Sequence, residues 1–262
     1  MKPIRFERVD NVGHVILANP PLNLINTPFS NALREAVQEA SLSGIRALLI
    51  RSEGPNFSHG GDIMDFIDKD FDAWRTFISD THATYRAIEA LQIPTIAAVR
   101  GACYGGAVEL CLACDFIVAA ENASFLHLEA SVGSAPVAGG VQRFAERVGR
   151  ARAARYVMLS EAISGTKAEE IGLVAFVAPE AETEVKAGAL ATQLSNGPTR
   201  SYAAVRTLLK AWAGGGVPAA DSVLLDVTMP LHGSEDARKG RTARVDAIRR
   251  GVQPEPVVFV GR

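Results

Sequence analysis

Short apolar segments alternate with segments of helical periodicity along the first half of this chain. Three apolar runs, at residues 46–51, 95–99 and 115–119, are typical of buried strands. Helical patterns separate them; one follows Thr27 and Pro28, which we expect to be the N-cap and the first helical residue, and another spans residues 72–91. Strands and helices that alternate in this way are joined by right-handed crossovers and lie parallel in one sheet. The alternation therefore predicts an α/β fold with a mainly parallel sheet.

The rest of the chain is predicted to add a few strands and many helices. We expect further strands at residues 6–9, 14–18 and 173–177, a turn at 101–105, and a helix from there to Cys114. Helical patterns dominate after residue 139, at residues 140–159, 166–171, 182–194, 199–213, 217–231 and 234–249. No linker or low-complexity segment divides the halves. We therefore expect one continuous unit, with an α/β core over residues 1–195 and a helical region over residues 196–262.

Composition excludes several classes of protein. The formal net charge is only −2 over 262 residues, which gives no electrostatic reason to expect a nucleic-acid or anionic-membrane partner. No apolar run approaches the roughly 18 residues of a membrane span, and residues 1–7 do not have the apolar stretch of a secretory signal. Three cysteines are an odd count for a disulfide framework, and Cys111 and Cys114 are expected to be buried thiols rather than a metal site. These features predict a cytoplasmic enzyme.

The residues after the predicted strand at 95–99 carry the first sign of chemistry. Gly105 and Gly106 open a helix, so their N–H groups are among the unpaired donors at a helix N-terminus, where the helix dipole also favours negative charge. Glu109 follows Gly106 by about one helical turn and can project over the same end of the helix. A solvated first-turn carboxylate is the simpler interpretation of Glu109. A carboxylate beside an anion-stabilising N–H is, however, well placed for proton transfer.

A second glycine loop repeats part of this pattern. Residues 57–62 (FSHGGD) follow the predicted strand at 46–51, and Gly61 could present its N–H toward the same point as Gly106. Two N–H groups that converge on one oxygen form an oxyanion hole, in which a single donor is typically worth about 10²–10³ in rate. Asp62 is expected to be the N-cap of a helix that begins at Ile63. A second carboxylate, Glu129, stands in a segment that could equally be a surface loop.

The joint pattern resembles the enoyl-CoA hydratase/isomerase (crotonase) superfamily over essentially the whole chain. The similar segments are residues 19–26 (NPPLNLIN), 57–63 (FSHGGDI), 93–101 (IPTIAAVRG), 105–110 (GGAVEL), 121–125 (ENASF), 136–143 (PVAGGVQR), 168–174 (AEEIGLV), 233–236 (GSED) and 259–262 (FVGR). The resemblance implies a spiral core of repeated strand–strand–helix units and a helical C-terminal trimerisation region. It also implies a homotrimer or a dimer of trimers.

Carried over residue by residue, the resemblance implies specific roles. The N–H groups of Gly61 and Gly106 would bind the oxygen of an acyl-CoA thioester, while Glu109 and Glu129 would be the catalytic pair. It further places substrate or CoA contacts at Leu24, His59, Gly60, Asp62, Ile63, Met64 and Pro136. No metal or separate cofactor is implied, because CoA is part of the substrate.

Both carboxylates together favour an enoyl-CoA hydratase, in which Glu109 activates water and Glu129 delivers a proton to the α-carbon. The alternatives are an enoyl-CoA isomerase, a dehydratase, a thioester hydrolase, or an inactive relative that binds acyl-CoA. The sequence departs from the family pattern at Leu128, where proline is usual, and at Val137, where glycine is usual. His59 replaces a small residue. Together with His127 it could bring a group that titrates near neutral pH to the site, although structural histidines are the simpler interpretation.

Overall fold

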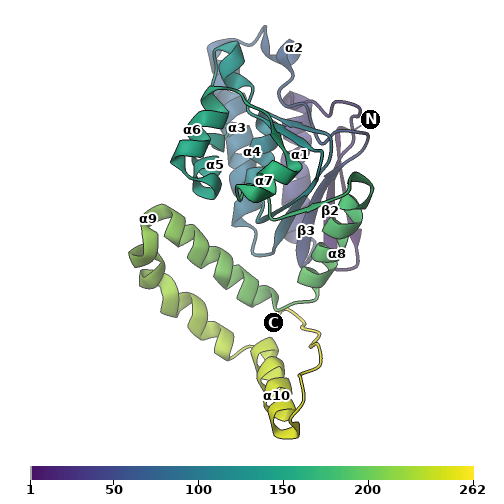
Figure 1. Cartoon of the computed structure of the whole chain (residues 1–262), viewed down its shortest axis with the longest axis vertical. Helices are drawn as coiled ribbons and strands as arrows, with labels where there is room; N and C mark the ends of the chain where they lie inside the picture. The colour runs from purple at the N-terminus through teal and green to yellow at the C-terminus, as the bar shows by residue number, and fades with distance from the viewer. Residues whose placement is uncertain (1) are drawn as a thin grey trace.

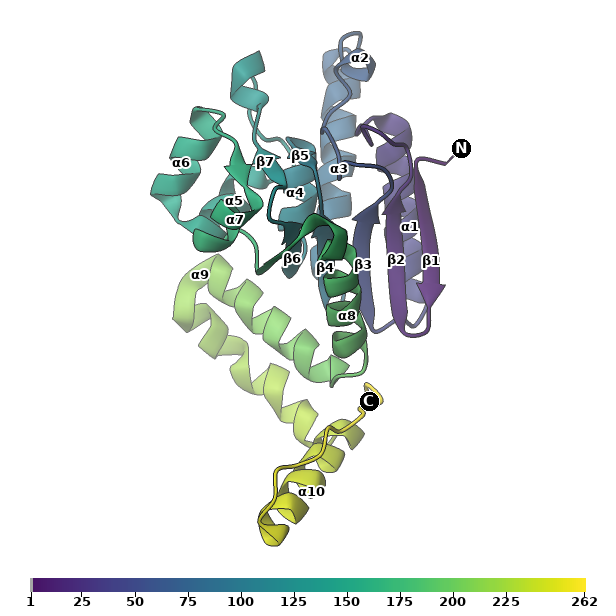
Figure 2. The same cartoon turned by 45° about the vertical axis from the view of Figure 1, so that its right-hand side comes forward.

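A computed structural model describes residues 2–262, and its centre is a six-stranded sheet in the order β1-β2-β3-β4-β6-β9. Only β1 and β2 pair antiparallel; every other neighbouring pair in this sheet is parallel. The strands are β1 (Ile4–Val9), β2 (Val12–Leu17), β3 (Ala47–Ser52), β4 (Thr95–Val99), β6 (Phe116–Ala120) and β9 (Phe176–Ala178). The parallel sheet that the alternation predicts is therefore confirmed (Figure 2).

A second sheet of three short strands lies against the first, in the order β5-β7-β8. Its strands are β5 (Ala102–Tyr104), β7 (Ser124–Leu126) and β8 (Ile163–Ser164). The turn predicted over residues 101–105 therefore contains a strand, which is too short to show a periodicity of its own. This small sheet matters for the site, because β5 leads into Gly105 and β7 leads toward Glu129.

The helices surround the sheet and then continue beyond it (Figure 1). They are α1 (Thr27–Leu42), α2 (Ile63–Phe66), α3 (Phe71–Ala90), α4 (Gly106–Leu112), α5 (Gly140–Val148), α6 (Arg150–Met158), α7 (Gly165–Glu170), α8 (Thr183–Ser195), α9 (Thr199–His232) and α10 (Glu235–Arg250), with 3₁₀ helices η1 (Glu129–Val132) and η2 (Glu180–Glu182). The single helix predicted over residues 140–159 is wrong: Gly149, with a φ of +83°, separates α5 from α6. Asn26, rather than Thr27, caps α1, because its side chain accepts the N–H of Phe29.

The parallel strands are buried on both faces because helices cover each face. On one face Leu49, Ile96 and Val118 pack against Ala187 and Ala191 of α8. On the other face the alternate strand residues join a larger core with α1, α3, α4 and α5. Fully apolar strands are the expected consequence of such double coverage. The three cysteines are free and buried in this larger core, as predicted.

The C-terminal helices extend away from the core (Figures 1 and 2). α9 contains a kink at Gly215 and Gly216, close to the break predicted between residues 213 and 217. The chain end then returns toward the core, where Arg46 donates hydrogen bonds to the carbonyls of Gly197 and Phe259. Within residues 2–262, no helix is both long enough and apolar enough to cross a membrane.

Candidate active site

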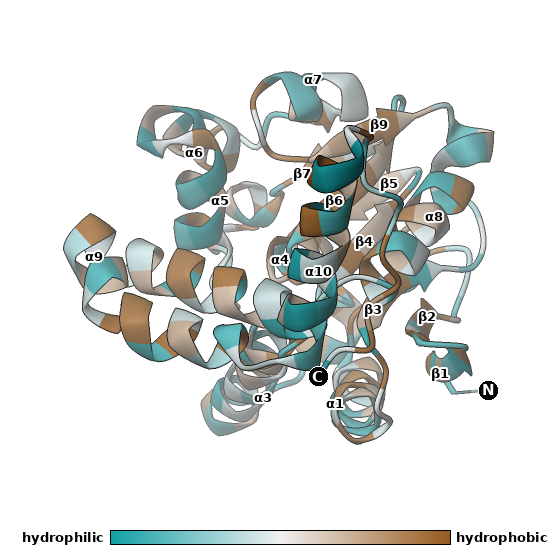
Figure 3. Ribbon diagram, turned by 90° about the horizontal axis from the view of Figure 1, so that it is seen from below, coloured by the Kyte–Doolittle hydropathy of each residue, from teal (hydrophilic) through white to brown (hydrophobic). Residues whose placement is uncertain are grey.

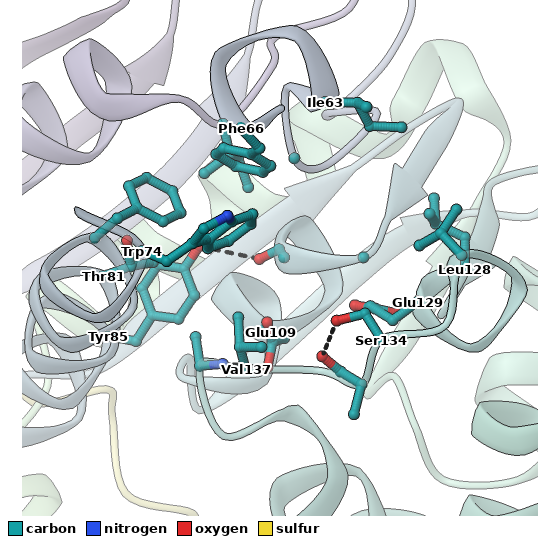
Figure 4. A pocket seen from close by; sticks show the side chains of 18 of the residues that line it. Ile63, Phe66, Trp74, Thr81, Tyr85, Glu109, Leu128, Glu129, Ser134 and Val137 are labelled. Carbon is teal, nitrogen blue, oxygen red and sulfur yellow. Dashed lines mark hydrogen bonds between the residues drawn. The ribbon is translucent and has the colours of Figure 1, made fainter. Parts of the chain in front are cut away.

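A cavity of about 420 Å³ lies where the two glycine loops meet α3 and η1 (Figure 4). Gly61, Gly106, Glu109 and Glu129, the four residues at the centre of the predicted site, all line it. The remaining lining residues are mostly apolar: Ile25, Ile63, Phe66, Ile67, Trp74, Phe77, Leu128, Val132, Ala135, Val137 and Ala138, with Thr81, Tyr85, Gly105 and Ser134. Two loops that are 45 residues apart in the sequence therefore share one chamber with two carboxylates.

The loop that carries Gly105 and Gly106 turns sharply between β5 and α4. Gly105 has a φ of +52°, in the left-handed region, and its N–H donates to the carbonyl of Leu126. A side chain there would also be crowded, because a Cβ would lie 3.3 Å from Oε1 of Glu129. Gly106 is the first residue of α4, and among residues 2–262 its N–H has no hydrogen-bond acceptor. A free N–H at a helix start can bind an anionic oxygen.

The second loop is held beside the first by Ile25. The backbone of Ile25 bonds to the residues on either side of Gly61: its N–H donates to Gly60, and its carbonyl accepts from Asp62. The N–H of Gly61 is left with no acceptor in the described chain. The side chain of Ile25 also reaches the other loop, since its Cδ1 would be 3.2 Å from a Cβ at Gly106. Both free donors thus border the same cavity.

Glu109 is buried rather than solvated, with 2% of its surface exposed. Its Oε1 accepts the N–H groups of Ala138, at 2.8 Å, and Gly140, at 2.7 Å. Burial raises the pKa of Glu109 from 4.5 to about 7, against the opposing effect of the Gly140 N–H; the neighbouring charge of Glu129 raises it further. A carboxyl group that titrates near neutral pH is suited to accept and release a proton during catalysis.

The loop that holds Glu109 is itself braced by Arg143 of α5. The guanidinium of Arg143 forms a two-bond ion pair with Glu89 of α3 and donates at 3.1 Å to the carbonyl of Gly139. Gly140 leaves room for the carboxylate, because a Cβ there would come within 2.8 Å of Glu109. Two elements distant in sequence therefore fix the orientation of Glu109.

Glu129 begins the 3₁₀ helix η1, which is separated from β7 by two residues. Its side chain is 14% exposed and lines the cavity together with Glu109 (Figure 4). One oxygen, Oε2, is 3.5 Å from Nδ1 of His127. His127 is 3% exposed, and its ring packs edge-on to Phe144 with 5.3 Å between ring centroids. His127 therefore lies against Glu129, although it does not line the cavity itself.

An aromatic wall, formed by Phe66, Trp74 and Phe77, lines one part of the cavity. Phe66 and Trp74 lie next to each other in Figure 4. Centroids of these rings are 4.7 to 6.1 Å apart. These three aromatic residues are not among the predicted site residues. A signal was present, since Trp74, Phe77, Thr81 and Tyr85 are spaced three or four residues apart and so share one face of α3.

The polar groups beside the wall are already bonded within the protein. The hydroxyl of Thr81 lies 3.1 Å from that of Ser30, and the hydroxyl of Tyr85 donates at 3.0 Å to the carbonyl of Gly106. This part of the cavity therefore presents an apolar surface. The Tyr85 bond also supports the loop that carries the free Gly106 N–H.

Most of the other predicted contact residues lie outside the cavity lining. Ile63 lines the cavity, whereas Leu24, Gly60, Met64 and Pro136 do not. Met64 is 78% exposed.

Asp62 caps α2, as predicted, by accepting the N–H of Met64. The ring of His59 packs edge-on to Tyr104, 5.2 Å between centroids, and is also absent from the lining. Leu128 and Val137, which also depart from the family pattern, both line the cavity.

Comparison with known proteins agrees with this architecture. The family model described as enoyl-CoA hydratase/isomerase matches residues 7–245. A Mycobacterium bovis protein named as a probable enoyl-CoA hydratase is 35% identical over 195 residues, which are 73% of this chain and 75% of that protein. One of the same name from Rhodobacter capsulatus is 27% identical over 260 residues, 99% and 98% of the two chains.

A solved structure gives the same result for the fold. The crystal structure of an enoyl-CoA hydratase from Geobacillus kaustophilus superposes with a TM-score of 0.91 at 25% identity, covering 100% of this chain and 98% of the other. The family model and the structural match both span the core and most of the C-terminal helices. The chain belongs to the enoyl-CoA hydratase/isomerase family and has the crotonase fold.

Proposed function

We propose that this protein is an enoyl-CoA hydratase, which adds water across the 2,3 double bond of a trans-2-enoyl-CoA thioester. The observation that carries the proposal is the convergence of Glu109, Glu129 and two unpaired N–H groups on one cavity. Hydration needs a site for the thioester oxygen, a group that takes a proton from water and a group that gives one to carbon. The four residues supply these functions without any further group.

In the proposed mechanism the N–H groups of Gly61 and Gly106 bind the thioester oxygen. A water molecule attacks the β-carbon while Glu109 takes one of its protons, and the electrons of the double bond move onto the thioester oxygen. The resulting enolate takes a proton at the α-carbon from Glu129. Water has then been added in full, Glu109 holds a proton and Glu129 is a carboxylate. Transfer of one proton from Glu109 to Glu129, through the next water, restores the starting state.

The bonding of Glu109 supports its role as the group that contacts water. Glu109 has its pKa near 7, and its Oε1 is occupied by two backbone N–H groups. Its second oxygen is therefore the one left to contact water.

The apolar lining supports an apolar acyl group. Phe66, Trp74 and Phe77 offer no charge to a substrate, and the neighbouring hydroxyls of Thr81 and Tyr85 are bonded elsewhere. A substrate carboxylate placed there would lose its hydration without gaining a partner, which is strongly unfavourable. We therefore expect alkyl or aryl enoyl thioesters to be preferred over enoyl thioesters that end in a carboxylate.

The CoA portion is proposed to extend from the cavity along the loops that carry Leu24, His59, Gly60, Asp62, Met64 and Pro136. These residues lie around the cavity rather than in it, which suits contacts to a pantetheine chain and nucleotide outside the reaction chamber. CoA is part of the substrate, and the proposed mechanism uses no further cofactor or metal.

The test is a panel of enoyl-CoA substrates in water labelled with heavy oxygen. Purified protein should convert crotonyl-CoA, a longer alkyl enoyl-CoA and cinnamoyl-CoA to 3-hydroxyacyl products that contain the label, and should convert glutaconyl-CoA poorly. The Glu109→Gln/Glu129→Gln double variant should have no hydration above background. Undiminished hydration by that variant would rule out the assigned roles.

Other products would identify another reaction. An unlabelled shifted double bond would show an isomerase, free CoA would show a thioester hydrolase, and net loss of water from 3-hydroxyacyl substrates would show a dehydratase. Binding of every thioester without turnover would show an inactive relative.

We further propose a homotrimer, or a dimer of trimers, in the cytoplasm. Apolar side chains on α9, among them Leu209, Trp212, Leu225 and Met229, are exposed in the single chain. Figure 3 shows that hydrophobic residues recur along this helix. Several exposed apolar side chains on one helix are typical of an interface between subunits. The three free thiols support a reducing compartment. Light scattering that gives the mass of one chain at micromolar concentration would contradict the trimer.

A further inference from the structure

In each carboxylate of the pair, one oxygen faces other groups of the protein. For Glu109 this is Oε1, which two backbone N–H groups hold at 2.7 and 2.8 Å. For Glu129 it is Oε2, which is buried and faces Nδ1 of His127 at 3.5 Å. The other oxygen of Glu129, Oε1, lies beside Gly105. The two carboxylates are thus arranged alike. Backbone N–H groups face one oxygen of Glu109, and the side chain of His127 faces one oxygen of Glu129.

His127 and this oxygen are unsatisfied groups in contact. Among residues 2–262, neither Nδ1 nor Nε2 of His127 has a hydrogen-bond partner, and the same is true of Oε2 of Glu129. A buried polar group without a hydrogen-bond partner destabilises a protein, so a bond between the two groups would be favourable. Phe144 restricts the imidazole on one side by an edge-on contact. The ring is therefore held where a small movement makes a hydrogen bond to Glu129.

We propose that His127 is a positioning residue for Glu129, donating its Nδ1–H to Oε2. This bond fixes the plane of the carboxyl group and leaves Oε1 free to exchange a proton with the α-carbon of the substrate. The present separation of 3.5 Å is longer than a hydrogen bond. Hydrogen bonds of catalytic groups are often long in a free enzyme and shorten when substrate binds.

The same bond has an electrostatic effect on the reaction. When Glu129 gives its proton to the α-carbon, negative charge develops on its carboxylate, and an N–H donor at Oε2 stabilises that charge. His127 would then do for Glu129 what the N–H groups of Ala138 and Gly140 do for Glu109. This kinetic effect rests on the proposed function, whereas the contact itself does not.

The kinetic test compares variants that differ in the donor. His127→Phe keeps a planar ring against Phe144 but has no donor, whereas His127→Asn places an amide N–H near the position of Nδ1. A hydrogen bond to a charged group is worth enough to predict a fall in kcat of about 10–100-fold for His127→Phe on crotonyl-CoA. KM should change little, and His127→Asn should recover most of the rate.

Tyr156→Leu is the matched control, because it alters the packing of Phe144 but leaves the contact between Phe144 and His127 and the donor in place. It should leave kcat within a few-fold of the unmodified protein. Equal losses in His127→Phe, His127→Asn and Tyr156→Leu would show a purely structural role and overturn the proposal. So would an unchanged kcat in His127→Phe.

A spectroscopic test requires neither enzymatic activity nor a folded His127→Phe variant. Nitrogen NMR of the protein labelled in its histidines, with His127 assigned from the signals missing in His127→Asn, reports which ring nitrogen carries a proton. Nδ1 of His127 should carry one, and the signals should shift when Glu129→Leu removes the acceptor. A proton-free Nδ1, or spectra that do not change in Glu129→Leu, would refute the contact. If no enoyl-CoA is hydrated, the proposed function fails while this spectrum still decides the contact.

Discussion

Replacement of Glu109 by glutamine should make the protein more stable at neutral pH while it removes activity. Glu109 is 2% exposed, and its pKa is about 7 in the folded chain against an ordinary 4.5. Between these values an unfolded chain releases the proton and the folded chain keeps it. The stability that protonated Glu109 contributes is therefore complete below pH 4.5 and is lost as the pH rises through 7.

The size of this effect follows from the interval between the two pKa values. Each pH unit corresponds to about 1.4 kcal/mol, so ionisation of Glu109 should lower the free energy of unfolding by about 3 kcal/mol in all. Glutamine carries no charge, and its carbonyl oxygen can still accept the N–H groups of Ala138 and Gly140. The free energy of unfolding of Glu109→Gln should therefore not fall in this way as the pH rises, and the loop that carries Ala138 and Gly140 should stay in place.

Urea unfolding of both proteins at pH 5, 6, 7 and 8, at one fixed protein concentration, measures the difference. The stability of Glu109→Gln relative to the unmodified protein should rise by roughly 1.4 kcal/mol per unit up to pH 7 and level off by pH 8. Its kcat for crotonyl-CoA should fall about 10²–10⁴-fold. Glu121→Gln, at an exposed position, is the control and should show no such rise. A stability difference that is independent of pH would refute the buried, raised-pKa account of Glu109.

Three other changes test separate parts of the site. Gly140→Ala should displace Glu109, because its Cβ would come within 2.8 Å of that side chain; we expect a loss of about 1–3 kcal/mol in urea unfolding and a lower kcat. Tyr85→Phe removes the donor to the Gly106 carbonyl and should lower stability by about 1 kcal/mol, with kcat reduced more than KM is changed; an unaltered kcat would show that this bond does not support the donor loop. Trp74→Ala should reduce kcat/KM for a long alkyl enoyl-CoA about tenfold relative to crotonyl-CoA, and an unchanged ratio would place the acyl chain elsewhere.

Local patterns predicted the parts of the fold that depend on neighbouring residues. Strands β3, β4 and β6 were predicted because burial on both faces makes them continuously apolar. The smaller sheet was missed because β5 and β7 have three residues each, too few for a periodicity. Gly149 ends α5 by its backbone conformation, and a glycine within a helical pattern does not by itself reveal that conformation.

The candidate site, too, could be predicted from the sequence only where its residues are neighbours along the chain. The spacing of Gly106 and Glu109 predicted that they share one end of a helix, and the structure places both at the cavity. Burial of Glu109 could not be predicted, because its partners are the backbone N–H groups of residues 138 and 140, on another element. The contact between His127 and Glu129 depends likewise on how η1 turns after β7. Tertiary packing, rather than local preference, sets the chemistry of these groups.

A crystal structure of the protein with butyryl-CoA, a saturated thioester that cannot add water, tests the central claim most directly. The thioester oxygen should lie 2.7–3.1 Å from the backbone nitrogens of both Gly61 and Gly106. Glu109 and Glu129 should lie on either side of the α- and β-carbons, with the acyl chain against Phe66, Trp74 and Phe77. A thioester oxygen bound away from either nitrogen, or either carboxylate turned from the acyl group, would contradict the proposed mechanism.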